Sequence, residues 1–179
     1  MDNIDRLIAD FRKEDTRAIS DPDTNSRKDT IISDLEEYCS DERVLAFLLE
    51  VATDSSEYDL ARFEVFKILF VRPIGNDVEL DRIGLAIEEV LAAEKENENV
   101  RNFAAIAASS YMACPRVVNA IEQIAIDALE NRNLRACAVD AIERNSISMR
   151  SINILQVLSK DRHFHQTAKR ILREWGVTP

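Results

Sequence analysis

The sequence is poor in residues that turn a chain sharply, with three glycines and four prolines among 179 residues. Average proteins contain about 12% of these two residues together. Apolar runs with alternating polarity, bounded by turn residues, are also missing, although strands and hairpins are normally marked in this way. Leu, Ile, Ala, Glu, Arg and Asp dominate instead, so the composition predicts an all-α protein.

Cysteine is also scarce, and the three cysteines form no C-x-x-C or Cys/His metal pattern: Cys39, Cys114 and Cys137. An odd number of thiols without such spacing is typical of a reducing, cytoplasmic compartment. The N-terminus alternates charged and apolar residues and lacks a secretory pattern. The longest apolar run, residues 104–114, is too short to span a membrane. We therefore expect a soluble cytoplasmic protein without membrane contact, in which Cys114 and Cys137 act as small core residues.

Motifs that carry common chemistries are absent as well. The chain has no P-loop, no Gly-rich dinucleotide turn, no G-x-S-x-G and no H-E-x-x-H. The two histidines, His163 and His165, are two residues apart, so they would not share a helix face as metal ligands at i and i+4 do. They are interpreted as helix-terminal residues, with anion binding beside Arg170 as the alternative. We expect no catalytic residue, cofactor or metal.

Charge is unevenly distributed along the chain. The formal net charge is −10, and residues 131–179 carry nine basic and four acidic side chains, which is +5 and leaves −15 for residues 1–130. Binding to duplex nucleic acid requires clustered Lys and Arg, so this balance argues against it. The acidic part could attract a basic protein partner, or it could simply keep the surface solvated.

From Asp41 onward the sequence repeats itself. Three arginines and a histidine recur at intervals of 39, 34 and 30 residues: Arg62, Arg101, Arg135 and His165. Each is followed by apolar residues three and seven positions later, which is helical spacing. A step of 18 residues back from each anchor reaches Val44, Ile83, Val117 and Ile147, with apolar residues again seven and eight positions later. Each unit is therefore predicted to be two amphipathic helices.

The repeats, in segments such as 42–69 and 115–144, resemble HEAT and HEAT-like repeats. Asp54 precedes Arg62 by eight residues and Asp127 precedes Arg135 by eight, as in that family. The other units depart from the pattern, with Ala93 and Val157 at the Asp position. The resemblance implies a right-handed α-α superhelix, or solenoid, of about four helix pairs, at residues 41–73, 76–113, 115–145 and 147–175. Residues 1–40 would form an N-terminal cap of two helices, at about 2–19 and 26–39, separated by a break at 20–23.

The helix predicted at residues 99–113 is the most apolar and alanine-rich segment. Its register places Ala104 and Ala108 in the core and Arg101 near the helix start. Small side chains let neighbouring helices approach closely, so this helix is expected to be the second helix of a middle unit.

The leading functional expectation is a non-enzymatic protein-binding module, an adaptor or inhibitor, that uses the groove lined by the second helices. A toxin-immunity protein is a narrower form, because an acidic protein can cover a basic nuclease. The alternatives are an enzyme similar to bilin lyases or DNA glycosylases of this repeat type, and a structural piece of a homo-oligomer. Candidate partner-binding residues are Arg62, Arg101, Arg135, His163, His165 and Arg170. For the three anchor arginines, bonding to Asp side chains or helix-end carbonyls is the structural alternative.

Overall fold

The computed structural model describes residues 2–14, 26–74 and 76–178, and in these ranges the chain is helical without strands. Within these ranges ten α-helices and one 3-10 helix follow one another. Their bounds are α1 Asn3–Lys13, α2 Lys28–Leu35, η1 Glu36–Tyr38, α3 Glu42–Thr53, α4 Asp59–Val71, α5 Asp77–Ala92, α6 Glu98–Ala108, α7 Pro115–Ile126, α8 Arg132–Arg144, α9 Met149–Leu158 and α10 His165–Glu174. The predicted all-α class is confirmed.

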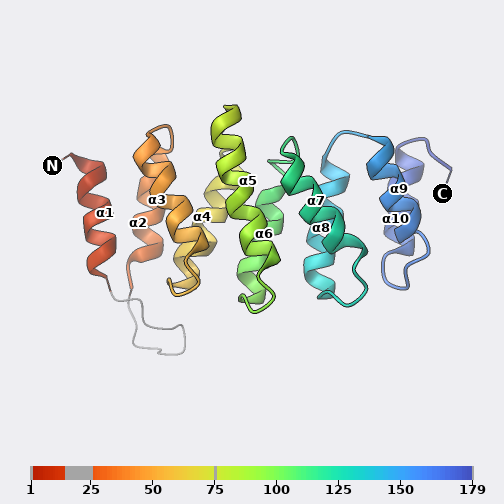
Figure 1. Ribbon diagram of the computed structural model, residues 1–179, viewed down its shortest axis with the longest axis horizontal. Helices are drawn as coiled ribbons and strands as arrows, with labels where there is room; N and C mark the ends of the chain where they lie inside the picture. Colours follow the sequence, from red (N-terminus) through yellow and green to blue (C-terminus); the bar gives the residue numbers. More distant parts are fainter. Residues whose placement is uncertain (1, 15–25, 75, 179) are drawn as a thin grey trace.

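The helices form two rows that run the length of the molecule (Figure 1). The first row contains α1, α3, α5, α7 and α9, and the second contains α2, α4, α6, α8 and α10. Each helix packs against its partner in the pair, and neighbours within the rows also pack, as α4 does against α6 and α6 against α8. In the view of Figure 1 the helices α3, α5 and α7 lie in front of α4, α6 and α8.

Local sequence explains where the helices begin. The Asn76 side chain accepts hydrogen bonds from the backbone N–H groups of Val78 and Glu79, and the Asn76 N–H donates to the Glu79 carboxylate, which completes a capping box. Asn97 and Asn131 cap α6 and α8 in a similar way. Pro115 occupies the first turn of α7, where its missing N–H is not needed. Side-chain caps thus mark the starts of α1, α3, α5, α6, α8 and α9, and the α-helices of the described ranges are 8 to 16 residues long.

The helix α6 lies at the centre of the second row. Ala104, Ala105, Ala107 and Ala108 are fully buried there, as the sequence predicts, between α4 and α8. The predicted helix is too long, however, because α6 ends at Ala108 and not at residue 113. The chain turns there, and the Tyr111 hydroxyl donates to the carbonyl of Leu69 at 3.0 Å. The same hydroxyl accepts from the N–H of Ile74 at 3.2 Å. One buried phenol therefore ties α4 and the link that follows it to the end of α6.

The first pair packs in the same manner as the later ones. Phe11 of α1 meets Phe47 of α3 edge to face, with ring centroids 5.1 Å apart, and α2 packs against α4. The predicted first helix extended to residue 19. The structure ends α1 at Lys13, with Glu14 as an extended C-cap, and the predicted helical residues 15–19 and the break at 20–23 lie outside the described residues. The second predicted helix corresponds to α2 and η1.

The last pair departs from the predicted register. Ile147 was expected in the buried stripe, but it is 55% exposed and precedes α9. The buried stripe of α9 consists of Ser151, Leu155 and Leu158. The helix α10 packs closely against α9 but lacks the close backbone packing against α8 that joins the earlier second helices. The step of 18 residues therefore fails in this unit, where α9 begins late and is short.

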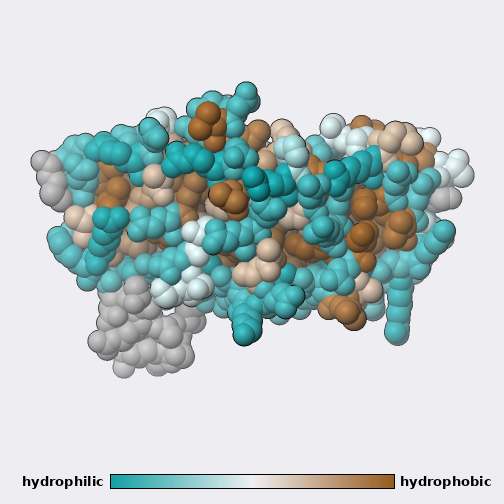
Figure 2. All heavy atoms as spheres, in the orientation of Figure 1, coloured by the Kyte–Doolittle hydropathy of each residue, from teal (hydrophilic) through white to brown (hydrophobic). Residues whose placement is uncertain are grey.

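None of the helices in the described ranges combines the length and apolar character needed to cross a bilayer. On the face shown in Figure 2, hydrophilic residues predominate, and apolar residues gather toward the C-terminal third. Exposed large apolar residues of that third include Ile126, Leu129, Ile147, Met149 and Val157.

Candidate functional site

Three arginines in the first turns of second helices are enclosed between helix pairs. The Nε and Nη2 atoms of Arg62 donate to the carbonyl of Ala52 at 3.2 and 3.1 Å, in the last turn of α3. Arg101 bonds in the same way to Leu91, and Arg135 to Ala125. The last carbonyls of a helix lack intrahelical partners, so each arginine closes the end of the first helix of its own pair.

The same side chains reach forward to the next pair. Arg62 binds both carboxylate oxygens of Glu96 at 2.9 and 2.6 Å. Arg101 binds Glu130 at 3.1 and 2.6 Å. Arg135 binds Asp161 at 2.6 Å. Each acid lies in the link before the following second helix, so one guanidinium joins the two helices of its pair to the pair that follows.

Lys28 begins this series. It lies 34 residues before Arg62, the interval that also separates Arg101 from Arg135. Its Nζ atom binds Glu57 at 2.7 Å and lies 4.5 Å from the centroid of the Phe11 ring. We call Lys28, Arg62, Arg101 and Arg135 the buried cation row.

The acids of this row are held in the charged form. Burial raises the pKa of Glu96, but hydrogen bonds from Arg62 and from the Asn97 N–H outweigh it and leave the pKa below its ordinary value. The pKa of Glu130 is lowered in the same way against the effect of burial, by Arg101 and the Asn131 N–H. Asp161 behaves alike, with Arg135 and two backbone donors lowering its pKa. Each contact is therefore a true ion pair at neutral pH.

This geometry supports the structural alternative for the three anchor arginines. Arg62, Arg101 and Arg135 are 0, 9 and 3% exposed, so they offer a partner almost no surface. The Asp residues eight positions earlier are not their partners, because Asp54 accepts from Ser56 and Asp127 from Leu129. The real partners stand four or five residues before the next anchor. An acid at that spacing precedes every anchor, a signal that the repeat alignment overlooked.

The remaining candidates lie near the C-terminal end. Arg170 is exposed and binds Glu143 of α8 at 2.8 and 2.9 Å, and Glu174 at 2.9 Å. Hydrogen bonds to these two acids raise its pKa. His163 is exposed, and its backbone N–H donates to Asp161, whereas His165 is partly buried at the start of α10. The charge of Arg170 is therefore already compensated within the chain.

A second series of arginines lies on the exposed side of the first helices and points in the opposite direction. Arg116 of α7 reaches back to Asp81 and Glu88 of α5, at 3.3 and 2.6 Å. The others are Arg43 of α3 with Asp2 and Asp5 of α1, Arg82 of α5 with Glu42 of α3, and Arg150 of α9 with Glu122 of α7. We call Arg43, Arg82, Arg116 and Arg150 the exposed arginine row.

The outer side of the second helices is formed by residues one, two, five, eight and nine positions after each member of the buried cation row, and after His165 in α10. These positions are exposed or partly exposed, whereas positions three and seven are buried in all five helices. We call this surface the second-helix face. At its centre Phe63 of α4 and Phe103 of α6 stack with centroids 5.0 Å apart and an interplanar angle of 17°. Ile106, three residues after Phe103 on α6, is 37% exposed.

The middle of this face is uncharged, because the helix α6 has no charged side chain between Asn102 and Ala108. On either side of it, α4 carries Glu64 and Lys67, and α8 carries Asp140, Glu143 and Arg144. At one end η1 exposes Glu37, and at the other α10 exposes Arg170, Arg173 and Glu174. The face therefore combines an uncharged aromatic and aliphatic centre with an acidic and a basic end.

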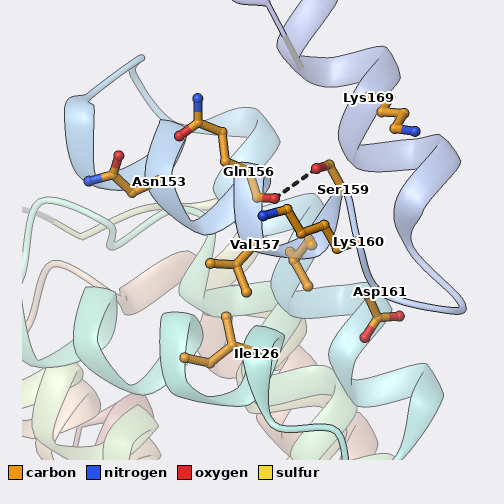
Figure 3. Close-up of a pocket in the computed structure, with 9 residues that line it drawn as sticks. Ile126, Asn153, Gln156, Val157, Ser159, Lys160, Asp161 and Lys169 are labelled. Atoms are coloured by element: carbon orange, nitrogen blue, oxygen red, sulfur yellow. Dashed lines mark hydrogen bonds between the residues drawn. The ribbon is translucent and has the colours of Figure 1, made fainter.

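A wide, open hollow of about 950 Å³ lies where the last pair meets the one before it (Figure 3). Ile126 and Val157 provide apolar walls, and Lys160, Lys169 and Asp161 provide charge. The hollow holds one carboxylate, which is already paired with Arg135. General acid–base chemistry needs titratable groups poised to exchange a proton, and these lining residues do not supply such a pair.

Neither a candidate metal-binding cluster nor an exposed thiol is found in the described ranges. No group of three or more His, Cys, Asp and Glu side chains there could hold a metal ion. Cys39 and Cys114 are buried and Cys137 is partly buried. Burial raises the pKa of the Cys39 and Cys137 thiols, which disfavours the nucleophilic thiolate.

Comparison of the chain with family models, curated proteins and solved structures found no match in any of the three. The class that the geometry defines is thus an all-helical protein built of consecutive helix pairs, joined by a buried row of cations.

Proposed function

We propose that this chain is a non-enzymatic protein-binding module that uses the second-helix face. The helix pairs would form a right-handed α-α superhelix of the HEAT-like kind, with this face as its binding surface. The observation that supports the proposal is the stacked pair Phe63 and Phe103 beside Ile106, an apolar centre flanked by charge. Aromatic residues at the centre and charges at the rim are the usual composition of protein interfaces.

The rest of the molecule favours a protein over a small ligand or a nucleic acid. The hollow of Figure 3 is open to solvent and lacks convergent catalytic groups. The net charge of −10 disfavours a phosphate backbone. The buried cation row holds successive pairs together, so the face is presented on a preorganised scaffold, which lowers the entropic cost of binding.

An unbiased interaction screen with a matched pair of variants tests the proposal. Ile106 of α6 and Leu85 of α5 are exposed aliphatic residues, 37 and 51%, in the two helices of the same pair. Ile106→Arg places a charge on the second-helix face, and Leu85→Arg places the same charge on the other row. We expect partners of the wild-type chain to be lost with Ile106→Arg and kept with Leu85→Arg. Binding lost only with Leu85→Arg, or no partner at all, would overturn the proposal.

A narrower form of this function is inhibition of a basic toxin in the cytoplasm. It is supported by the balance of −15 over residues 1–130, which would speed the approach of a basic partner. Co-expression with a candidate toxin domain tests it. Growth rescue that is abolished by Ile106→Arg would support it, and rescue that is independent of Ile106 would contradict it.

A further inference from the structure

On the second-helix face, equivalent positions on the two sides of α6 carry opposite charges. The residues five positions after each anchor lie at equivalent places on the five helices, and they are Ser33, Lys67, Ile106, Asp140 and Arg170. The middle position is apolar, and the positions on either side of it carry opposite charges. Lys67 and Asp140 are well exposed, with side-chain exposures of 60 and 53%. Each is also paired within its own helix, Lys67 with Glu64 at 2.9 Å and Asp140 with Arg144 at 2.8 Å.

Consider a second copy related by a two-fold axis that runs parallel to α6 in the plane of this face. This axis would place apolar residues opposite apolar residues and charged residues opposite residues of the other sign. Such an axis exchanges α2 with α10 of a second copy and α4 with α8, and it places α6 against itself. Ile106 then meets Ile106 of the other copy, and Lys67 meets Asp140. In a two-fold interface every such contact occurs twice, so two Lys67–Asp140 pairs would form.

The two ends of the face match in the same operation. Glu37 of η1, nine positions after Lys28, comes opposite Arg173 of α10, eight positions after His165, in the other copy. With the alternative axis, perpendicular to the helices, α2 would face α2 and acid would meet acid. Charge complementarity thus selects one arrangement of the two copies.

The size of the face is that of a stable dimer interface. Five helices spaced about 8–10 Å apart cover roughly 40–50 Å. Helices of about 12 residues are about 18 Å long, so the face measures roughly 700–900 Å². A standard interface buries about 800 Å² on each partner.

We propose that the protein partner of the second-helix face is a second copy of this chain, docked through a two-fold axis at α6. The inference rests on the proposed use of this face and names its partner. The uncharged centre supplies the apolar contact, and the charged ends fix the orientation of the copies.

A charge-swap experiment tests the arrangement by sedimentation equilibrium. We expect the wild-type chain to sediment at twice its mass of 20.4 kDa at concentrations up to about 100 μM. Lys67→Glu puts like charges at both symmetric contacts, and so does Asp140→Lys, so each variant alone should dimerise about tenfold more weakly or worse. A mixture of the two restores both contacts, and a 1:1 heterodimer should return to wild-type affinity. Lys95→Glu, in the exposed link before α6, makes the same charge change outside the face and should leave the dimer unchanged.

The outcomes separate this inference from the proposed function. A wild-type chain that remains a monomer overturns the inference, and the proposed function survives if another protein binds and is lost with Ile106→Arg. A dimer that neither charge reversal weakens, or a mixture that fails to recover, places the interface elsewhere and also overturns the inference. If neither a second copy nor another protein depends on Ile106, both proposals fail. Circular dichroism of each variant shows that the fold is retained.

Discussion

The buried cation row and the exposed arginine row perform the same task with opposite geometry. Both link consecutive helix pairs, but Arg62, Arg101 and Arg135 reach forward to the next pair, whereas Arg116 and its counterparts reach back to the previous one. The buried side chains are 0, 11 and 3% exposed. Those of the exposed row range from 36 to 56%.

Because of this difference in burial, the two rows should contribute different amounts to the stability of the fold. An exposed ion pair is worth about 0–1 kcal/mol because water and salt compete for both charges. Removing one partner of a buried pair costs about 3–5 kcal/mol, since the other charge stays behind without water. The three arginines of the buried row also donate to helix-end carbonyls, which lack intrahelical partners. The two rows look alike as ion pairs, but only the buried one should decide whether the pairs stay stacked.

The largest expected effect comes from removing one member of the buried row. Arg62→Met keeps the apolar stem but leaves Glu96 without its cation and the carbonyl of Ala52 without the guanidinium donor. We expect the free energy of unfolding to fall by about 3–5 kcal/mol, measured by urea denaturation.

A second variant separates the cost of the orphaned charge from the loss of packing. Arg62→Met combined with Glu96→Leu removes both charges, and it should recover a large part of the lost stability because apolar replacements of buried pairs are well tolerated. A single variant that loses less than about 1 kcal/mol would show that Arg62 behaves like an exposed arginine.

Acid should weaken the buried row through its carboxylates. Glu96, Glu130 and Asp161 have folded pKa values below their ordinary values. Their contribution to stability is therefore complete above the unfolded pKa, about 4, and it is lost as the pH falls through the lower folded value. We expect the free energy of unfolding to fall below about pH 4.5. Replacing Glu96 with Gln should flatten this dependence, and an unchanged slope would mean that Glu96 does not titrate differently on unfolding.

A smaller effect should follow where α5 packs against the start of α7, beside Arg116. A Cβ atom on Gly84 of α5 would lie 2.5 Å from the Sγ atom of Cys114. Gly84→Ala should therefore cost about 1–3 kcal/mol, although Ala is favoured over Gly in an unobstructed helix by about 1 kcal/mol. Cys114→Ala in the same chain removes the clash and should return most of the loss in thermal denaturation. Stabilisation by Gly84→Ala alone would show that α5 and α7 can separate freely.

Much of the second row could be predicted from the sequence because its signals are local. The spacing of Arg62, Arg101 and Arg135 placed them in the first turns of α4, α6 and α8, and the burial of Ala104 and Ala108 is confirmed. The acids that pair with the arginines lie on the next helix pair. Their spacing is visible in the chain, but their contacts depend on how the pairs stack.

The last pair and the exposed row show where local patterns fail. Ser151 is buried in α9 together with Leu155 and Leu158, and its backbone N–H donates to the Ser148 side chain. A polar residue at a buried position hides the register, so Ile147 was chosen wrongly. The partners of Arg116 lie 28 and 35 residues earlier, on another helix, and no pattern within α7 indicates them.

The smallest effect should come from the exposed row, and its salt dependence sharpens the contrast. Arg116→Gln removes contacts to Glu88 and Asp81 that are largely open to water. A double-mutant cycle of Arg116→Gln with Glu88→Gln should give a coupling energy of about 0.2–1 kcal/mol, which declines as salt is added. The matching cycle at Arg101 and Glu130 should give a larger energy that salt hardly changes, because both side chains are mostly buried. Equal coupling energies at the two sites, or equal salt dependence, would mean that burial does not separate the two rows.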